Sequence, residues 1–98
     1  MNIDIQTEGI AMRPEWHRTI DEWIRGCRAH HPDVIGVDLV LRHAARDEAT
    51  VVATMRGARV RAAGEGDLMA AALHEALDGL EHELLVHEAV GRRLRPAA

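Results

Sequence analysis

The chain of 98 residues has no lysine, serine, phenylalanine or tyrosine, and it has one cysteine and two tryptophans. Two common catalytic nucleophiles are therefore missing, and there is no phosphate-binding glycine loop and no paired cysteines. We expect a protein that is not an enzyme and needs no cofactor. The scarcity of aromatic residues also argues against a surface on which the bases of single-stranded nucleic acid stack.

The single cysteine, Cys27, excludes a disulfide within the chain and is typical of a reducing compartment. The first residues do not show the basic patch and apolar run of a signal peptide. No apolar stretch approaches the roughly 20 residues that a membrane span requires. We therefore expect a cytoplasmic protein without a membrane segment, folded as a single domain over residues 1–98.

Charge is unevenly distributed along the chain. All twelve basic residues are arginines, and sixteen acidic residues give a formal net charge of −4 with neutral histidines. The domain as a whole would not attract nucleic acid. Six of the acidic residues and no arginine fall between Asp67 and Glu88. Protonation of the histidines in this stretch, with a reference pKa of about 6.5, would reduce its negative charge and favour RNA binding in acid.

Apolar residues alternate with period two in residues 2–8, 34–44, 48–56 and 58–62, which predicts four strands. In the second strand the side chains expected to face the core are Ile35, Val37, Leu39 and Leu41. Residues 14–29 have helical spacing, and one arc of that helix holds Trp16, Ile20, Trp23, Ile24 and Cys27. A second helix follows Asp67, a good N-cap. Its apolar stripe comprises Met69, Leu73, Ala76, Leu77, Leu80, Leu84 and Val90.

The order strand, helix, three strands, helix predicts an α+β fold of the β-α-β-β-β-α type. Each strand and each helix has one apolar side, so we expect a four-stranded mixed sheet with two helices packed on one face. A right-handed crossover makes the first two strands parallel, and hairpins make the remaining pairs antiparallel. The second face of the sheet is left to solvent or to a partner.

The passage from the last strand into the second helix reads RVRAAGEGDLMAAALHEALDGLEHEL. It resembles the ribosome hibernation-promoting factors and ribosome-associated inhibitors, also called sigma modulation proteins. The similarity lies in a small-residue strand, a glycine, an Asp-Leu pair, paired alanines and the spacing of the leucines. The segment VIGVDLVLR resembles the second strand of the same family, and the order of elements agrees over nearly the whole chain.

The resemblance implies a protein that binds the small ribosomal subunit under stress or in stationary phase. In that family the two helices present a basic surface to ribosomal RNA, translation is blocked, and no reaction is catalysed. This chain departs from the pattern in its second helix, where family members carry lysine and arginine. The corresponding positions here are Gly79, Glu81, His82, Glu83, His87 and Glu88. Each missing phosphate contact reduces the salt-dependent part of RNA affinity.

The remaining cations are the candidate RNA-binding residues. Arg18 and Arg25 share one face of the first helix, with Arg28 further round, and Arg59 and Arg61 project from the outer sheet face beside Arg42. The end of the chain adds Arg92, Arg93 and Arg95. The alternative is that these arginines only solvate the domain and pair with neighbouring carboxylates such as Asp21 and Glu22.

Three further interpretations remain open. The first is a protein–protein interaction module on the same fold that has lost ribosome binding and uses the second helix or the open sheet face; exposed Leu85 and Val86 would suit a partner or a homodimer contact. The second is a weak metal site at His74, Asp78 and His82, which lack a fourth ligand. The third concerns the other histidines: His87 is expected at the edge of the core, and His30 and His31 in a turn.

Overall fold

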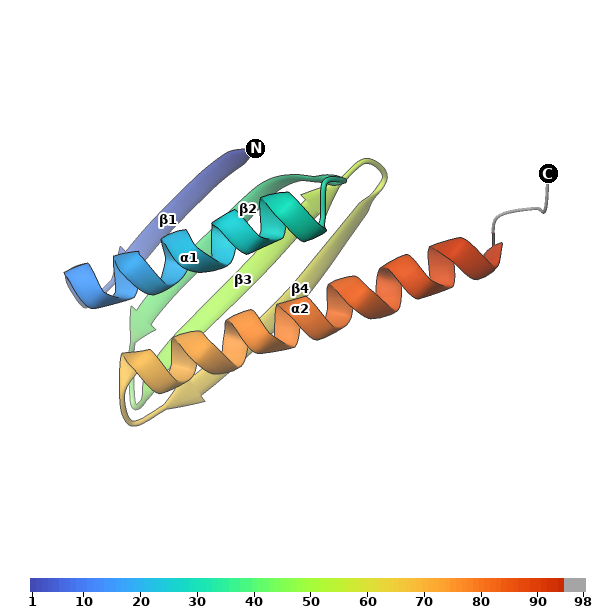
Figure 1. The fold of residues 1–98 in the computed structure, drawn as a ribbon. Coiled ribbons are helices and arrows are strands. Elements are labelled where there is room, and N and C mark those ends of the chain that lie inside the picture. Colours follow the sequence, from blue (N-terminus) through green and yellow to red (C-terminus); the bar gives the residue numbers. More distant parts are fainter. Residues whose placement is uncertain (95–98) are drawn as a thin grey trace.

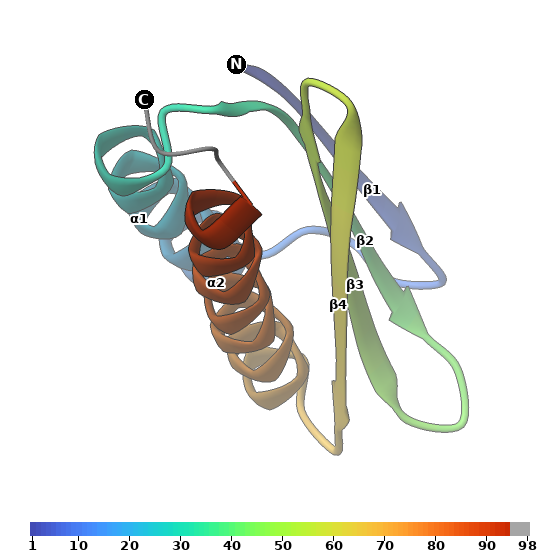
Figure 2. The ribbon, with the colours of Figure 1, turned by 90° about the vertical axis from the view of Figure 1, so that its right-hand side faces the viewer.

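The computed structural model describes the backbone of residues 1–94 and the side chains of residues 1–91. The elements are β1 (Asn2–Glu8), α1 (Pro14–His30), β2 (Val34–His43), β3 (Asp47–Met55), β4 (Ala58–Gly66) and α2 (Met69–Leu94). The strands lie in the order β1-β2-β3-β4, with β1 parallel to β2 and the other pairs antiparallel (Figure 1). Both helices cover one face of the sheet (Figure 2). The predicted α+β fold is confirmed.

Helix α1 begins at Pro14, whose fixed φ suits the first helical position. Arg13 precedes it and makes no side-chain cap; its guanidinium lies 5.4 Å from the centre of the Trp16 ring. The predicted arc is correct, because Trp16, Ile20, Ile24 and Cys27 are buried and Trp23 is half-buried. Pro32 follows the end of the helix closely and disfavours helical geometry at the residue before it.

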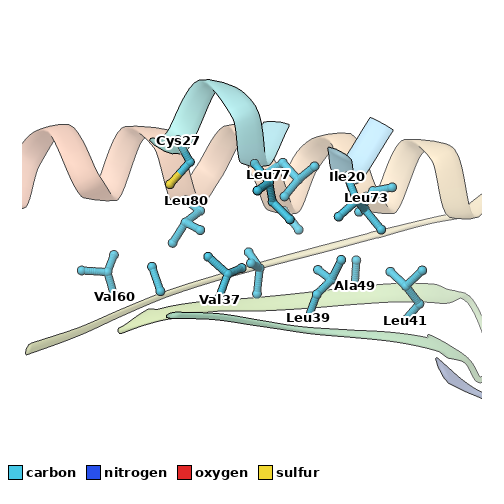
Figure 3. Close-up of a cluster of buried hydrophobic side chains, with 14 of the residues drawn as sticks. Ile20, Cys27, Val37, Leu39, Leu41, Ala49, Val60, Leu73, Leu77 and Leu80 are labelled. Carbon is cyan, nitrogen blue, oxygen red and sulfur yellow. The ribbon is translucent and has the colours of Figure 1, made fainter. Parts of the chain in front are cut away.

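The core lies between the two helices and the inner face of the sheet (Figure 3). Strand β3 contributes every second residue to it, as the alternation predicts: Ala49, Val51, Ala53 and Met55 are all buried. The apolar stripe of α2 packs onto this face and buries Leu73, Leu77, Leu80 and Leu84. Burial of these side chains is the main favourable contribution to folding.

Small residues allow α2 to lie unusually close to β4. A Cβ atom at Gly64 would collide with the carbonyl oxygen of Ala72 and lie 2.7 Å from the nitrogen of Ala76. One turn further along, a Cβ at Gly79 would lie 3.3 Å from that of Ala62. Close packing therefore explains the small residues of β4, which also carry the family resemblance. A larger side chain there would push the helix away from the sheet.

Two expectations need correction, one about strand β2 and one about the first residue of helix α2. Ile35 was expected to face the core, but it is 55% exposed, because a bulge between Val34 and Gly36 turns Val34 inward instead. Helix α2 begins at Met69, one residue later than a cap at Asp67 would place it. The carboxylate of Asp67 lies 3.5 Å from the guanidinium of Arg46, and β4 extends as far as Gly66.

The C-terminal part of α2 runs past the end of the sheet (Figure 1). Val90, expected in the apolar stripe, is 46% exposed, and His87, expected at the edge of the core, is also exposed. Both predictions are wrong for the same reason: the periodicity of the helix continues where no sheet lies beneath it. Leu85 and Val86 are exposed, as expected.

Candidate nucleic-acid interface

Helix α1 presents three candidate arginines to solvent. Arg18, Arg25 and Arg28 are exposed, and none of them forms an ion pair with any residue whose side chain is described. Asp21, one of the expected neutralising carboxylates, lies 3.0 Å from Nδ1 of His17 instead. The α1 arginines therefore remain available to an anionic partner.

The outer sheet face separates the other candidates. Arg59 and Arg61 lie on the edge strand β4, opposite Thr54 and Val52 of β3. Arg42 lies on β2, opposite Glu48, and its guanidinium is 3.8 Å from the carboxylate of Glu8. The expectation that Arg42 stands beside Arg59 and Arg61 is wrong, because β3 intervenes and the register places Arg42 toward the other end of the sheet.

The exposed face of α2 is acidic. Glu75, Asp78 and Glu83 are exposed along it, together with His74 and His82, and no arginine occurs from Met69 to Gly91. Arg92 and Arg93 lie in the last turn of the α2 backbone, and Arg95 lies outside the described residues. A polyanion would be repelled by the middle of α2 at neutral pH.

A buried histidine joins the two helices, which the sequence reasoning missed. His31 follows α1 directly and is only 2% exposed. Its Nδ1 bonds to the carboxylate of Glu88, and its Nε2 lies 2.9 Å from both carboxylate oxygens of Glu81. Ionised carboxylates only accept hydrogen bonds, so contacts at both ring nitrogens favour the imidazolium form of His31, in which both nitrogens donate. The signal in the sequence was the seven-residue spacing of Glu81 and Glu88, which places both on one helix face.

The electrostatics of this cluster follow from its geometry. Burial alone would lower the pKa of His31, but the hydrogen bonds to Glu88 and Glu81 and the charges of both carboxylates raise it above its ordinary value of 6.5. Burial also raises the pKa of the Cys27 thiol to about 11, and the same two carboxylates add to that rise. Cys27 is therefore an unreactive core thiol.

The structure gives no support to a metal site in the part of the chain that it describes. His74, Asp78 and His82 lie exposed on α2, and no group of three or more potential ligands among the described residues is positioned to hold an ion. Glu81 and Glu88 bind opposite nitrogens of His31, so the three cannot share one ion.

Neither described helix is long and apolar enough to cross a membrane.

The fold defines the class of protein that this chain resembles. No protein-family model matches the sequence, and no curated protein matches it. Solved structures do match. A ribosomal subunit interface protein from Coxiella burnetii has a TM-score of 0.82 at 14% identity, over 91% of this chain and 99% of that one. The N-terminal domain of Protein Y from Thermus thermophilus has a TM-score of 0.76 at 19% identity, over 89% and 99%.

These likenesses confirm, for the fold, the resemblance to the ribosome hibernation-type proteins that the sequence suggested. Both neighbours are matched along almost their full length, so the similarity covers the complete β-α-β-β-β-α arrangement and not one supersecondary unit. At such low identity a shared fold does not fix the surface residues, so the surface charges of this chain do not follow from those of its neighbours.

Proposed function

We propose that the protein is a ribosome-associated translation regulator that binds small-subunit ribosomal RNA under stress or in stationary phase. The observation that carries this proposal is the fold likeness to a ribosomal subunit interface protein over 91% of the chain. Such a protein acts by occupying a site on the ribosome and catalyses no reaction. It works in the cytoplasm, which agrees with one cysteine kept as a free thiol.

The arginines supply the necessary cations. Arg18, Arg25 and Arg28 on α1 and Arg59 and Arg61 on β4 are exposed and lie in no ion pair among the side chains of residues 1–91. Each guanidinium that contacts a phosphate releases counterions and adds to RNA affinity. Arg92, Arg93 and Arg95 extend the same supply at the end of the chain, whereas Arg42 is engaged with Glu8.

Co-sedimentation with purified small ribosomal subunits over a salt series tests the proposal. The protein is expected to pellet with the subunits at about 50 mM salt and to be released steeply as salt increases, because phosphate contacts dominate the affinity. Large subunits serve as the comparison. Failure to pellet at the lowest salt would contradict the proposed function.

The second candidate is a protein–protein interaction module on the same fold. It is favoured by the acidic exposed face of α2, which adjoins the exposed apolar side chains of Leu85 and Val86. Acidic surface beside apolar surface suits a basic amphipathic partner segment or a second copy of the chain. Absence of ribosome binding at low salt, with dimer formation in analytical ultracentrifugation, would favour this candidate.

A further inference from the structure

The arginines divide into two groups according to their place in the fold. Toward the end that holds the start of α1 and the β2–β3 turn, Arg13, Arg42 and Arg46 each lie within 4.0 Å of a carboxylate. Arg46 lies close to two carboxylates, 3.6 Å from that of Glu65 and 3.5 Å from that of Asp67. These guanidinium groups are already partnered at the surface.

The opposite end holds arginines without carboxylate partners among the described side chains. The last turn of α1, the β3–β4 turn and the end of α2 all lie at this end, on the right of Figure 1 and toward the viewer in Figure 2. Arg28 belongs to the α1 turn, Arg56 to the β3–β4 turn and Arg59 to the first residues of β4, and all three are exposed. We call this set the free-arginine end. Arg18 lies in the first half of α1, away from this end.

A groove of about 670 Å³ opens at the free-arginine end. It is bounded by the loop of residues 30–35, by Met55 and Arg56, and by His87, Glu88 and Gly91 of α2. Val34, Ile35 and Met55 give it apolar walls, and Arg56 also lines it. The groove forms because α2 extends past the sheet, so no strand packs against this part of the helix.

We propose that the RNA backbone docks on the free-arginine end, across the ends of both helices and the β3–β4 turn, and not along the outer face of α2. This inference rests on the proposed function and specifies its contact surface. It adds Arg56, which the sequence did not single out. The last turn of α2 contributes Arg92 and Arg93 to the same end of the fold.

Two carboxylates adjoin this surface and must be weighed against the arginines. Glu88 lines the groove, and a protonated His31 is shared between Glu88 and Glu81, so it offsets only one of these two negative charges. Asp33 is exposed in the loop and remains a local negative charge. Arg28, Arg56 and Arg59 outnumber these remaining negative charges, whereas in the middle of α2 the exposed charges are all carboxylates. A phosphate chain is therefore favoured at this end over the outer face of α2.

The test compares two triple variants of the full chain. Arg28→Gln, Arg56→Gln and Arg59→Gln remove the free-arginine end, and the matched control carries Arg13→Gln, Arg42→Gln and Arg46→Gln. Each removes three positive charges from exposed positions, so both change the net charge equally. Circular dichroism verifies that both fold. Binding to small ribosomal subunits is measured over a salt series.

The free-arginine variant is expected to bind at least tenfold more weakly at 100 mM salt. Its plot of log affinity against log salt concentration should be flatter by roughly 2 to 3, since each of the three lost phosphate contacts removes about 0.7 to 0.9 from the slope. The control variant should keep the wild-type slope. Equal weakening of both variants, or weakening of the control alone, would contradict the free-arginine end as the contact surface. The proposed function would still stand in that case, because the wild-type protein binds the subunit. If the wild-type protein does not bind at all, the proposed function fails, and the docking surface fails with it.

Discussion

The buried His31 predicts a specific dependence of stability on pH. His31 is held between Glu81 and Glu88 of α2 and fastens the end of α1 to that helix. The informative perturbation is the double variant Glu81→Gln with Glu88→Gln, which preserves side-chain volume and removes both negative charges. The imidazole then keeps neutral hydrogen-bond partners but loses the carboxylates that raise its pKa.

The magnitude follows from the type of hydrogen bond. A bond to a charged group contributes about 1.5 to 3 kcal/mol, against about 0.5 to 1.5 kcal/mol for a neutral one. Two bonds change from the first kind to the second. The side chain of Glu81 is 42% exposed and that of Glu88 is 29% exposed, so water screens part of the difference. We expect the variant to lose roughly 1 to 2 kcal/mol of unfolding free energy at pH 6, or at least about 4 °C in melting temperature.

The sign of the pH effect is fixed by the direction of the pKa change. The pKa of His31 is higher in the folded protein than in the unfolded chain, so the folded state binds the extra proton. The stabilisation is complete below the unfolded pKa of about 6.5 and is lost as pH rises through the folded pKa. Between the two values, unfolding free energy should fall by about 1.4 kcal/mol per pH unit.

Urea denaturation followed by the fluorescence of Trp16 and Trp23 measures this between pH 5.5 and 8.5. The difference in stability between wild type and the double variant should be largest near pH 6 and shrink as pH rises. His17→Gln is the control, because the His17–Asp21 pair is exposed on both sides and should contribute less than about 1 kcal/mol. Parallel stability curves for wild type and double variant across this range would refute the assignment of a buried imidazolium.

Two further predictions concern the core. Gly64→Ala should lower the unfolding free energy by about 1 to 3 kcal/mol in urea denaturation, because the added methyl group collides with the backbone of α2. Gly26→Ala is the control. Its Cβ position has open space around it, so this substitution should be neutral or stabilising by up to about 1 kcal/mol. Equal effects of the two substitutions would contradict the close approach. The Cys27 thiol, with a pKa of about 11, should react with a disulfide reagent at pH 8 roughly 100-fold more slowly in the native protein than in urea. Rapid native labelling would show that the thiol is accessible.

The sequence predicted those parts of the fold in which one periodicity persists over a whole element. Strand β3 alternates without interruption, and the arc of α1 has one apolar face, so both were correct. Ile35 was misplaced because a bulge shifts the alternation by one residue, and the sign of it in VIGV, Gly36, was not used. Val90 was misplaced because periodicity reports which side of a helix a residue occupies and not whether the sheet extends that far.

The candidate site was harder to predict because it depends on pairings between residues distant in sequence. The sequence shows twelve arginines but not that Arg46 lies close to both Glu65 and Asp67, or that Arg56 forms no ion pair with the described side chains. The same is true of His31, which resembles an ordinary turn residue until residues 50 and 57 positions later are brought against its ring. Local spacing carries a signal only for the Glu81 and Glu88 half of that cluster, and this half was not predicted either.

A fold likeness at 14% identity constrains the interior of this protein more than its surface. Gly64 and Ala72 are fixed by the distance between β4 and α2, and a change there costs packing energy. An exposed Glu75 or Glu83 on α2 contributes little to stability, so evolution can replace a basic side chain at such a position without loss of the fold. Whether ribosome binding survives such replacements depends on where cations remain unpaired. Under the proposed function, the acidic middle of α2 argues for a contact at the free-arginine end and does not by itself argue against a ribosomal partner.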